Sequence, residues 1–194
     1  MSIIKSHDFT LWGNAGNRKI FLRPLNDEHL PFLYKWNSDP EVLYWSEGAD
    51  VQENDAETVH IIYGKTSQTA YCFLIEADGV PVGECWLQKM NVKTVLEKYP
   101  GDADVRRIDM MIGDKNYWGA GIGTTIVGLL VDFTFTHEKV DYLHGLVFDY
   151  NQRSRRVFEK NGFTLFIREP STQAPKKAKE DLYFRITKDD YFLR

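Results

Sequence analysis

The chain has 194 residues, a length that suits one domain with a core large enough to fold alone. Its 43% hydrophobic and 27% charged residues are typical of a soluble globular protein, and its net charge of −4 disfavours a nucleic-acid binder, which needs a basic face. The first residues, MSIIKSHDF, lack the apolar core of a signal peptide, and the longest apolar run, 126–131, is too short to cross a bilayer. We therefore expect a single domain over 1–194, located in the cytoplasm, with neither a nucleic-acid nor a membrane partner.

The chain contains two cysteines, Cys72 and Cys85, which form no CxxC pair. Each lies among residues that favour strands. Reduced thiols packed as small apolar groups explain them better than a disulfide, a metal site or a nucleophile. No metal site is predicted.

The N-terminal part predicts a strand followed by a helix. KIFLRPL at 19–25 alternates apolar and polar residues and ends near a proline, which is typical of a strand. Asn26 and Asp27 are candidate N-caps for a helix with Leu30 and Leu33 on one face. The stretch from 38 to 57 carries many acids and only weak turn patterns, so no element is predicted there.

A second helix and a hairpin come next. ETVHIIYGKT at 57–66 predicts a helix that Gly64 ends. Residues 70–90 contain two β-rich runs on either side of Asp78–Gly79, the dipeptide that favours a two-residue hairpin turn.

In the second half, a glycine-rich loop at 117–125 lies between a predicted strand and a predicted helix. The predicted elements are a strand at 105–113, a helix at 123–139, a strand at 140–148, a helix at 151–163 and a closing hairpin of 163–169 with 181–187. A strand–loop–helix–strand unit among antiparallel elements implies an α+β fold with a mixed sheet.

The loop YWGAGIGTT raises two interpretations. In the first, the glycines form a plain turn that needs positive φ. In the second, they let the backbone N–H groups at a helix N-terminus approach and bind a phosphate. A P-loop is excluded because Gly123 is followed by Thr124 and Thr125, with no lysine. A dinucleotide-binding fingerprint is excluded because the loop is late in the chain and has the spacing GxGxG.

Residues 105–163 resemble the GCN5-related N-acetyltransferase (GNAT) superfamily. Its central motif is a strand, a Q/R-x-x-G-x-G/A loop and a helix, and residues 118–123 fill that loop here with Trp118 in place of Gln or Arg. Its next signature is an Asn that opens a helix, followed by an aromatic, a charged pair and GF. The chain repeats that signature in order with Asn151, Ser154, Phe158, Glu159, Lys160, Gly162 and Phe163.

The resemblance implies a GNAT fold, with about seven strands and about four helices, that binds acetyl-CoA. The pyrophosphate is expected on the N–H groups of 119–124 and the pantetheine arm along the preceding strand. The cofactor-binding residues so implied are Met111, Ile112, Gly113, Trp118, Gly119, Ala120, Gly121, Ile122, Gly123, Thr124, Asn151, Ser154 and Phe158. Asn151 is also expected to cap its helix.

Acyl transfer to an amine needs a neutral nucleophile and a proton for the leaving thiolate. In the family a Tyr often supplies that proton, but the matching residue here is Phe158. The proton then comes from another donor, from the ammonium intermediate or from water. Tyr150 is a nearby substitute, although a packing role fits it better.

Three acidic residues are candidates for the amine site. Asp109 is the first candidate for the base or amine-binding carboxylate, because an acid in a strand interior is costly to bury unpaired. The alternatives for Asp109 are an ion pair with Arg106 or Arg107 and an outward-facing position. Glu84 is a second catalytic candidate, with a place on a solvated face as its alternative, and Asp149 is a candidate contact for a polycationic substrate.

Residues 33–48 and the RRID segment are similar to aminoglycoside 6′-N-acetyltransferases. By position, Trp45 then belongs to the substrate wall, and Asp109 holds the reacting amine. Residues 47–57 add Asp50, Glu53 and Asp55 and contain no Lys or Arg, so they form either a lip that attracts a cation or a solvated acidic loop.

The predicted function is therefore direct acetyl transfer to the primary amine of a small cationic substrate such as an aminoglycoside, which suggests antibiotic resistance. The alternatives are acetylation of protein N-termini, including those of ribosomal proteins, and a sensor that binds acetyl-CoA without turnover. In this fold the last hairpin, 163–187, often borders a dimer interface, so a homodimer is compatible with the resemblance.

Overall fold

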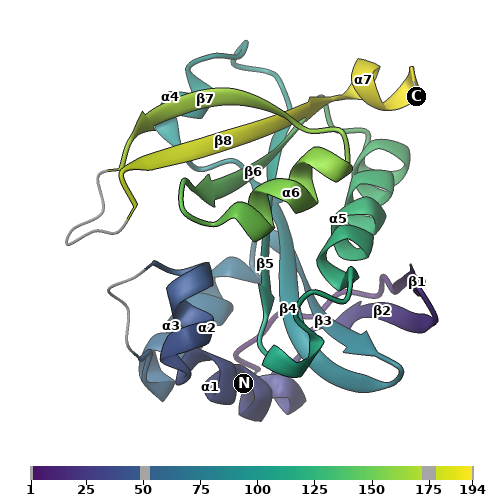
Figure 1. The fold of residues 1–194 in the computed structure, drawn as a ribbon, viewed down its shortest axis with the longest axis vertical. Coiled ribbons are helices and arrows are strands. Elements are labelled where there is room, and N and C mark those ends of the chain that lie inside the picture. The colour runs from purple at the N-terminus through teal and green to yellow at the C-terminus, as the bar shows by residue number, and fades with distance from the viewer. Residues whose placement is uncertain (1, 49–52, 172–177, 194) are drawn as a thin grey trace.

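The computed structural model describes residues 2–48, 53–171 and 178–193. They form one eight-stranded sheet in the order β1-β2-β3-β4-β5-β6-β8-β7 (Figure 1). Neighbouring strands are antiparallel except β5 and β6, which are parallel. The strands are β1 Leu11–Ala15, β2 Arg18–Pro24, β3 Ala70–Ala77, β4 Val80–Lys89, β5 Val105–Ile112, β6 Tyr142–Phe148, β7 Thr164–Pro170 and β8 Glu180–Thr187. The mixed α+β prediction is confirmed, and β1 is the strand that the sequence did not predict.

The described residues contain seven α-helices, where about four were predicted. They are α1 Leu30–Asn37, α2 Pro40–Ser46, α3 Ala56–Thr66, α4 Lys93–Leu96, α5 Ile122–Asp132, α6 Gln152–Lys160 and α7 Lys188–Phe192. Two 3-10 turns, Asp27–His29 and Lys115–Tyr117, and a π-helix, Phe133–Glu138, complete the set. None of the helices in these described ranges is long and apolar enough to span a bilayer.

Three helix boundaries differ from the prediction. Gly64 does not end α3, which continues to Thr66; a Cβ added at this glycine would lie 3.3 Å from the Ile3 carbonyl oxygen, so the position serves close packing and not a helix stop. The predicted helix 123–139 begins at Ile122 and widens into a π-helix, which faces three consecutive residues, 133–135, into the core. Asn26 caps the 3-10 turn that precedes α1 rather than α1 itself.

The hairpin turn was predicted correctly. Asp78 and Gly79 both have positive φ, 52° and 80°, as a two-residue hairpin turn requires. They connect β3 to β4 in the middle of the sheet.

Helices cover both faces of the sheet. One core cluster joins α5 to residues such as Cys85 and Ile108, and a second joins α1–α3 to residues such as Cys72 and Met111. Both cysteines are buried and free, as predicted.

The sheet splits between β5 and β6. These strands pair only from Val105–Tyr142 to Ile108–Gly145, although β5 continues to Ile112 and β6 to Phe148. The Phe158 ring packs against Gly145, where an added Cβ would lie 2.2 Å from the ring. The carboxyl half of β5 therefore keeps an unpaired backbone edge that faces the split.

Candidate active site

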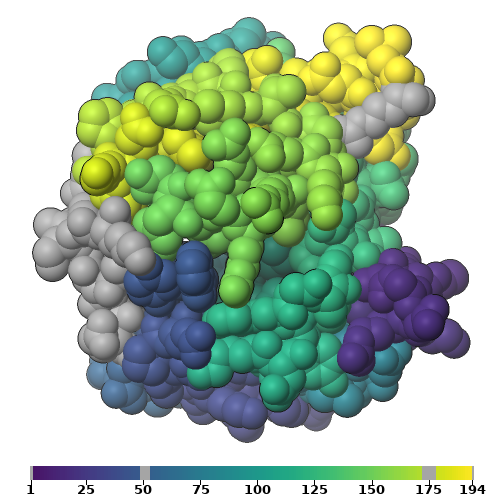
Figure 2. Space-filling view, in the orientation of Figure 1, coloured from purple at the N-terminus to yellow at the C-terminus, as the bar shows by residue number. Residues whose placement is uncertain are grey.

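A cavity of about 800 Å³ opens at the split. In Figure 2 the surface is hollowed between the light-green region that includes α6 and the dark-blue and teal regions below it. The cavity is lined by α2, α3, β4, β5, the glycine loop, α5, β6 and α6. It brings together all the predicted site residues except Gly113, Ala120 and Asp149.

The glycine loop combines both interpretations of the sequence. Gly119 and Gly121 have φ of 77° and 79°, which only glycine adopts without strain. Gly121 is the N-cap of α5 and offers no side chain to its first turn. The N–H groups that open α5 therefore face the cavity without a side-chain cap, where the helix dipole favours an anion.

Trp118 and Gly113 have structural tasks beside this loop. The Trp118 indole N–H donates to the Ile112 carbonyl at 2.7 Å, which fixes the loop to the end of β5. Gly113 lies against Trp36, whose ring would be 2.1 Å from an added Cβ. Gly113 is thus needed for packing, whatever its part in binding.

Asn151 joins the two sides of the split, because it connects the start of α6 to α2. Its side-chain oxygen accepts from the Ser154 N–H at 3.1 Å, which is the predicted N-cap of α6. Its side-chain amide donates to the Trp45 carbonyl at 2.9 Å. Tyr150 adds a second link, because its hydroxyl donates to the Tyr44 carbonyl at 2.6 Å. This bond supports the packing interpretation of Tyr150.

Asp109 lines the cavity and is also ion-paired. Arg107 donates to both of its carboxylate oxygens, at 2.8 and 2.7 Å, and Gln88 donates to one of them at 2.6 Å. The alternation of β5 places Arg107 and Asp109 on one face, while Arg106 pairs with Asp104. The ion-pair interpretation is therefore observed, and it fixes the orientation of the Asp109 carboxylate.

Two further carboxyl groups face the same end of the cavity. Glu84 is 4% exposed, and one of its carboxyl oxygens has no hydrogen-bond partner. Burial raises the pKa of Glu84 well above its ordinary value, and the charges of Glu47 and Asp109 raise it further. Glu47 follows α2, lines the cavity and remains exposed to solvent there; desolvation by the surrounding wall, followed by the Asp109 charge, raises its pKa. This acidic end is the set Glu47, Glu84 and Asp109.

The opposite end of the cavity is basic. Arg153, Arg156 and Lys160 recur at helical spacing along α6 and line the cavity. Within the described ranges, none of them has a carboxylate partner. This basic stripe therefore faces the glycine loop, and its charge is not paired by any carboxylate in the described part of the chain.

Asp149 lies outside the cavity. Both of its carboxylate oxygens accept from the Lys179 N–H, at 3.2 and 3.4 Å, so the side chain holds the start of β8. In the acidic lip, Glu53 is exposed and Asp55 caps α3 through the Thr58 N–H. Asp50 lies outside the described residues.

Glu47 and the basic stripe were missed from the sequence. Glu47 follows α2, and the unused indication of that helix is Asp39–Pro40, an N-cap followed by proline at the first helical position. In the sequence, the basic stripe has the pattern of an ordinary solvated helix face. Its position beside the glycine loop depends on the tertiary fold, which places α6 over that loop.

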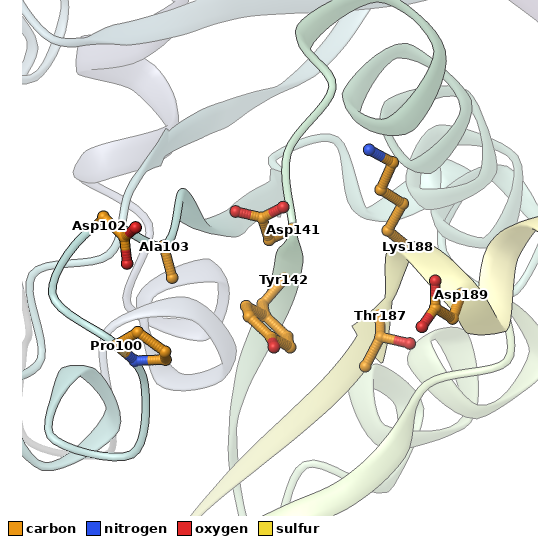
Figure 3. A pocket seen from close by; sticks show the side chains of 8 residues that line it. All are labelled: Pro100, Asp102, Ala103, Asp141, Tyr142, Thr187, Lys188 and Asp189. Carbon is orange, nitrogen blue, oxygen red and sulfur yellow. The ribbon is translucent and has the colours of Figure 1, made fainter.

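A second cavity, of about 280 Å³, lies at the far end of the sheet (Figure 3). Asp102, Asp141 and Asp189 surround it, and Asp141 accepts from the Asp104 N–H. None of the predicted site residues lines it. No cluster of three metal-ligating side chains occurs within the described ranges.

Comparison with known families decides the assignment. Residues 19–164 match the family model described as an acetyltransferase (GNAT) domain. The chain belongs to this GNAT family. It is an acetyl-CoA-dependent N-acetyltransferase, and the recognition made from the two motifs is confirmed.

Its curated relatives include aminoglycoside N(6′)-acetyltransferases type 1 from Klebsiella pneumoniae and Serratia marcescens. Each is 26% identical over 154 residues, which cover 76% of this chain and 75% of the relative. Among solved structures, aminoglycoside acetyltransferase AAC(6′)-Ib with coenzyme A has a TM-score of 0.74 at 20% identity, covering 90% of this chain and 98% of that chain. Spermidine N-acetyltransferase from Vibrio cholerae with CoA and spermine has a TM-score of 0.73 at 16% identity, covering 89% and 98%.

The cavity fits acetyl-CoA. The open N–H groups of α5 and the basic stripe suit its phosphates, and the unpaired edge of β5 suits the amides of its pantetheine arm.

Proposed function

We propose that this N-acetyltransferase acetylates a primary amine of a small polycationic substrate, with an aminoglycoside 6′-amine as the acceptor best supported. The observation that carries the proposal is the different chemistry of the two ends of one cavity, one lined by cationic side chains and the other by carboxyl groups. The basic stripe lies beside the glycine loop, whereas the acidic end holds three carboxyl groups and one arginine, Arg107. An anionic cofactor and a cationic acceptor then meet at the split.

At the cofactor end, the N–H groups of Ile122, Gly123 and Thr124 are the proposed pyrophosphate ligands. Met111 and Ile112 present the backbone edge for the pantetheine arm, and Ser154 reaches it from α6. Acetyl-CoA supplies an acyl group on a good leaving thiolate. The protein adds orientation and keeps both reactants in one cavity.

At the acceptor end, Asp109 is proposed to accept a hydrogen bond from the reacting amine, and Trp45 to form the wall. Because Glu84 is buried and next to other carboxylates, it is suited to take a proton from the incoming ammonium once it has ionised. The neutral amine then attacks the acyl carbon. Attack by the neutral amine would transfer the acyl group from sulfur to nitrogen, and the proton that the nitrogen gives up would go to the departing thiolate or to water.

The proton for the thiolate does not come from the usual tyrosine position. Phe158 is 3% exposed and packs against Phe163 and Gly145. The Tyr150 hydroxyl is committed to the Tyr44 carbonyl. The ammonium intermediate or water therefore protonates the thiolate in this proposal.

A polyamine is the second candidate acceptor. A spermidine N-acetyltransferase shares the fold, and a linear polyamine also suits an acidic cavity end. Protein N-termini remain a third class to be tested, and the sensor interpretation predicts binding of acetyl-CoA without turnover.

The test follows free-thiol release from acetyl-CoA with each amine class. It includes aminoglycosides that differ only in an amine or a hydroxyl at the 6′ position, spermidine, and short peptides with a free N-terminus. We expect release with the 6′-amine compound and none with its 6′-hydroxyl partner. Faster release with spermidine or a peptide would reassign the acceptor, and bound acetyl-CoA with no release from any amine would support the sensor.

A further inference from the structure

Arg153 is the member of the basic stripe at the start of α6. Its guanidinium carbon is 5.3 Å from the ring centre of Trp45 and 5.4 Å from that of Trp118. Trp45 belongs to α2 and Trp118 to the glycine loop, so one side chain touches three separate elements. In Figure 2 the light-green surface that includes α6 extends across the hollow toward the regions below it.

Contacts of this kind with aromatic rings leave the N–H donors of a guanidinium available. An arginine stacks through its planar faces, while its five N–H donors point outward in the plane. The described residues give Arg153 no carboxylate partner, and its side chain is exposed in the cavity. The two rings orient the guanidinium, and its N–H donors are unused. Such a group can bind an anion through two hydrogen bonds.

We propose that Arg153 is a cofactor-binding residue that donates to a phosphate of CoA. In the family motif, a Gln or Arg of the loop occupies the position of Trp118. Arg153 would supply the missing polar side chain from α6. The Trp118 indole N–H is used on the Ile112 carbonyl, so Trp118 contributes a ring face that orients the cation. The phosphate belongs either to the pyrophosphate or to the 3′-phosphate of the nucleotide.

The contact with Trp45 extends this role to the acceptor side. When the guanidinium engages a phosphate, its position over both indoles changes, because the same group contacts both rings. CoA binding is therefore expected to change the fluorescence of Trp45 and Trp118 before any amine is present.

The test measures CoA affinity by titration calorimetry for wild type, Arg153→Gln and Arg155→Gln, without an amine. Arg155 is the matched control, because it lies on the same helix and pairs with Glu159 at 2.7 Å, away from the cavity. We expect R153Q to weaken CoA binding about 10- to 100-fold and R155Q to leave it unchanged. Arg153→Lys, which keeps the charge but loses the planar fork, should give an intermediate affinity.

Two further arms identify the phosphate and exclude a packing role. If the R153Q loss disappears with 3′-dephospho-CoA, the partner is the 3′-phosphate; if it persists, the partner is the pyrophosphate. The ratio of the R153Q Kd to the wild-type Kd should shrink toward one at high salt, because a charge contact is screened, and the CoA-induced fluorescence change should be lost in R153Q. Equal CoA affinity of R153Q and R155Q, or a loss that salt does not change, would overturn the assignment. Neither result depends on which amine is the acceptor.

Discussion

At the scale of single residues, the Asp109 carboxylate is where ion pairing and the proposed chemistry meet. Asp109→Asn keeps the size of the side chain but removes the charge that orients the amine. We expect kcat/KM to fall at least about 100-fold, as for a misplaced reacting group, in steady-state thiol release with the preferred amine.

Asp104→Asn is the matched control for this variant. Asp104 immediately precedes β5 and pairs with Arg106 of that strand through two hydrogen bonds of 2.7 and 2.9 Å, but it lies outside the cavity. The Asp104→Asn variant should lose some stability, because an ion pair is removed. Its activity should stay within about twofold of wild type, because the lost pair lies outside the cavity. Equal activity losses in the two variants would reduce Asp109 to a structural ion pair.

The burial of Glu84 predicts an unusual dependence of the protein's stability on pH. Its pKa is raised in the folded protein, so the folded state binds the proton more tightly than the unfolded state. Stability therefore falls as the pH rises above the unfolded pKa of Glu, about 4.3. Glu84→Gln removes this penalty. Thermal unfolding should show a higher Tm for E84Q than for wild type at pH 8 and no difference near pH 4.

The same variant checks the catalytic part of the proposal. In wild type, kcat/KM should rise with pH through the raised pKa of Glu84, and this limb should be absent from E84Q. A higher Tm at pH 8 with an unchanged pH–rate profile would leave Glu84 a buried acid without a role in proton transfer.

Residue types in unusual places were the part of the site that the sequence could predict. An acid inside a strand is rare enough to single out Asp109 and Glu84, and both line the cavity. Glu47 and Arg153 look like ordinary surface charges in the sequence. Their importance comes from where α2 and α6 place them, which depends on tertiary packing.

At the scale of elements, the glycine loop can be separated into backbone strain and anion binding. Gly121→Ala places a Cβ at a φ of 79°, which costs roughly 1–2 kcal/mol and shifts the N–H groups that open α5. We expect CoA affinity to fall at least about tenfold, a value that corresponds to 1.4 kcal/mol, measured by titration calorimetry.

Gly16→Ala provides the comparison for this loss. Gly16 has a φ of 60° in the turn between β1 and β2, with open space around it, so the change adds similar strain away from the cavity. Its Tm should fall as for Gly121→Ala, while its CoA affinity stays at the wild-type value. A parallel loss of affinity in both variants would show that general destabilisation explains the result.

Long periodic elements were predicted from the sequence, and short ones were not. The strand at 105–113, the hairpin at 70–90 and the helix at 151–163 have clear patterns. Helix α2 has seven residues and strand β1 has five, so neither repeats its pattern often enough to stand out. The missed α2 mattered most, because it places Trp45 and Glu47 at the cavity.

At the scale of the whole molecule, the two sides of the split share one core cluster, but the sheet itself joins them over a short length. Four residue pairs connect β5 to β6, and the Tyr44–Tyr150 and Trp45–Asn151 bonds connect α2 to the start of α6. A cofactor that contacts the glycine loop, β5 and α6 together therefore stabilises the assembled fold. CoA at 100 times its Kd should add about 2.7 kcal/mol to the free energy of unfolding, which raises the Tm by about 5–10 °C.

This thermal shift should be absent with adenosine, which lacks both the phosphates and the pantetheine arm. A Tm that CoA leaves unchanged at saturation would mean that the cavity is not the cofactor site.

The single-domain organisation of 1–194 and a homodimer through 163–187 stay predictions from the sequence.

The central claim is that one cavity holds an anionic cofactor and a cationic amine at its opposite ends. A crystal structure with CoA and a 6′-amino aminoglycoside tests this claim most directly. We predict phosphate oxygens on the N–H groups of 122–124, and the 6′-nitrogen within hydrogen-bonding distance of Asp109 and next to the CoA sulfur. An amine bound away from Glu47, Glu84 and Asp109, or a nucleotide at the acidic end, would contradict the account.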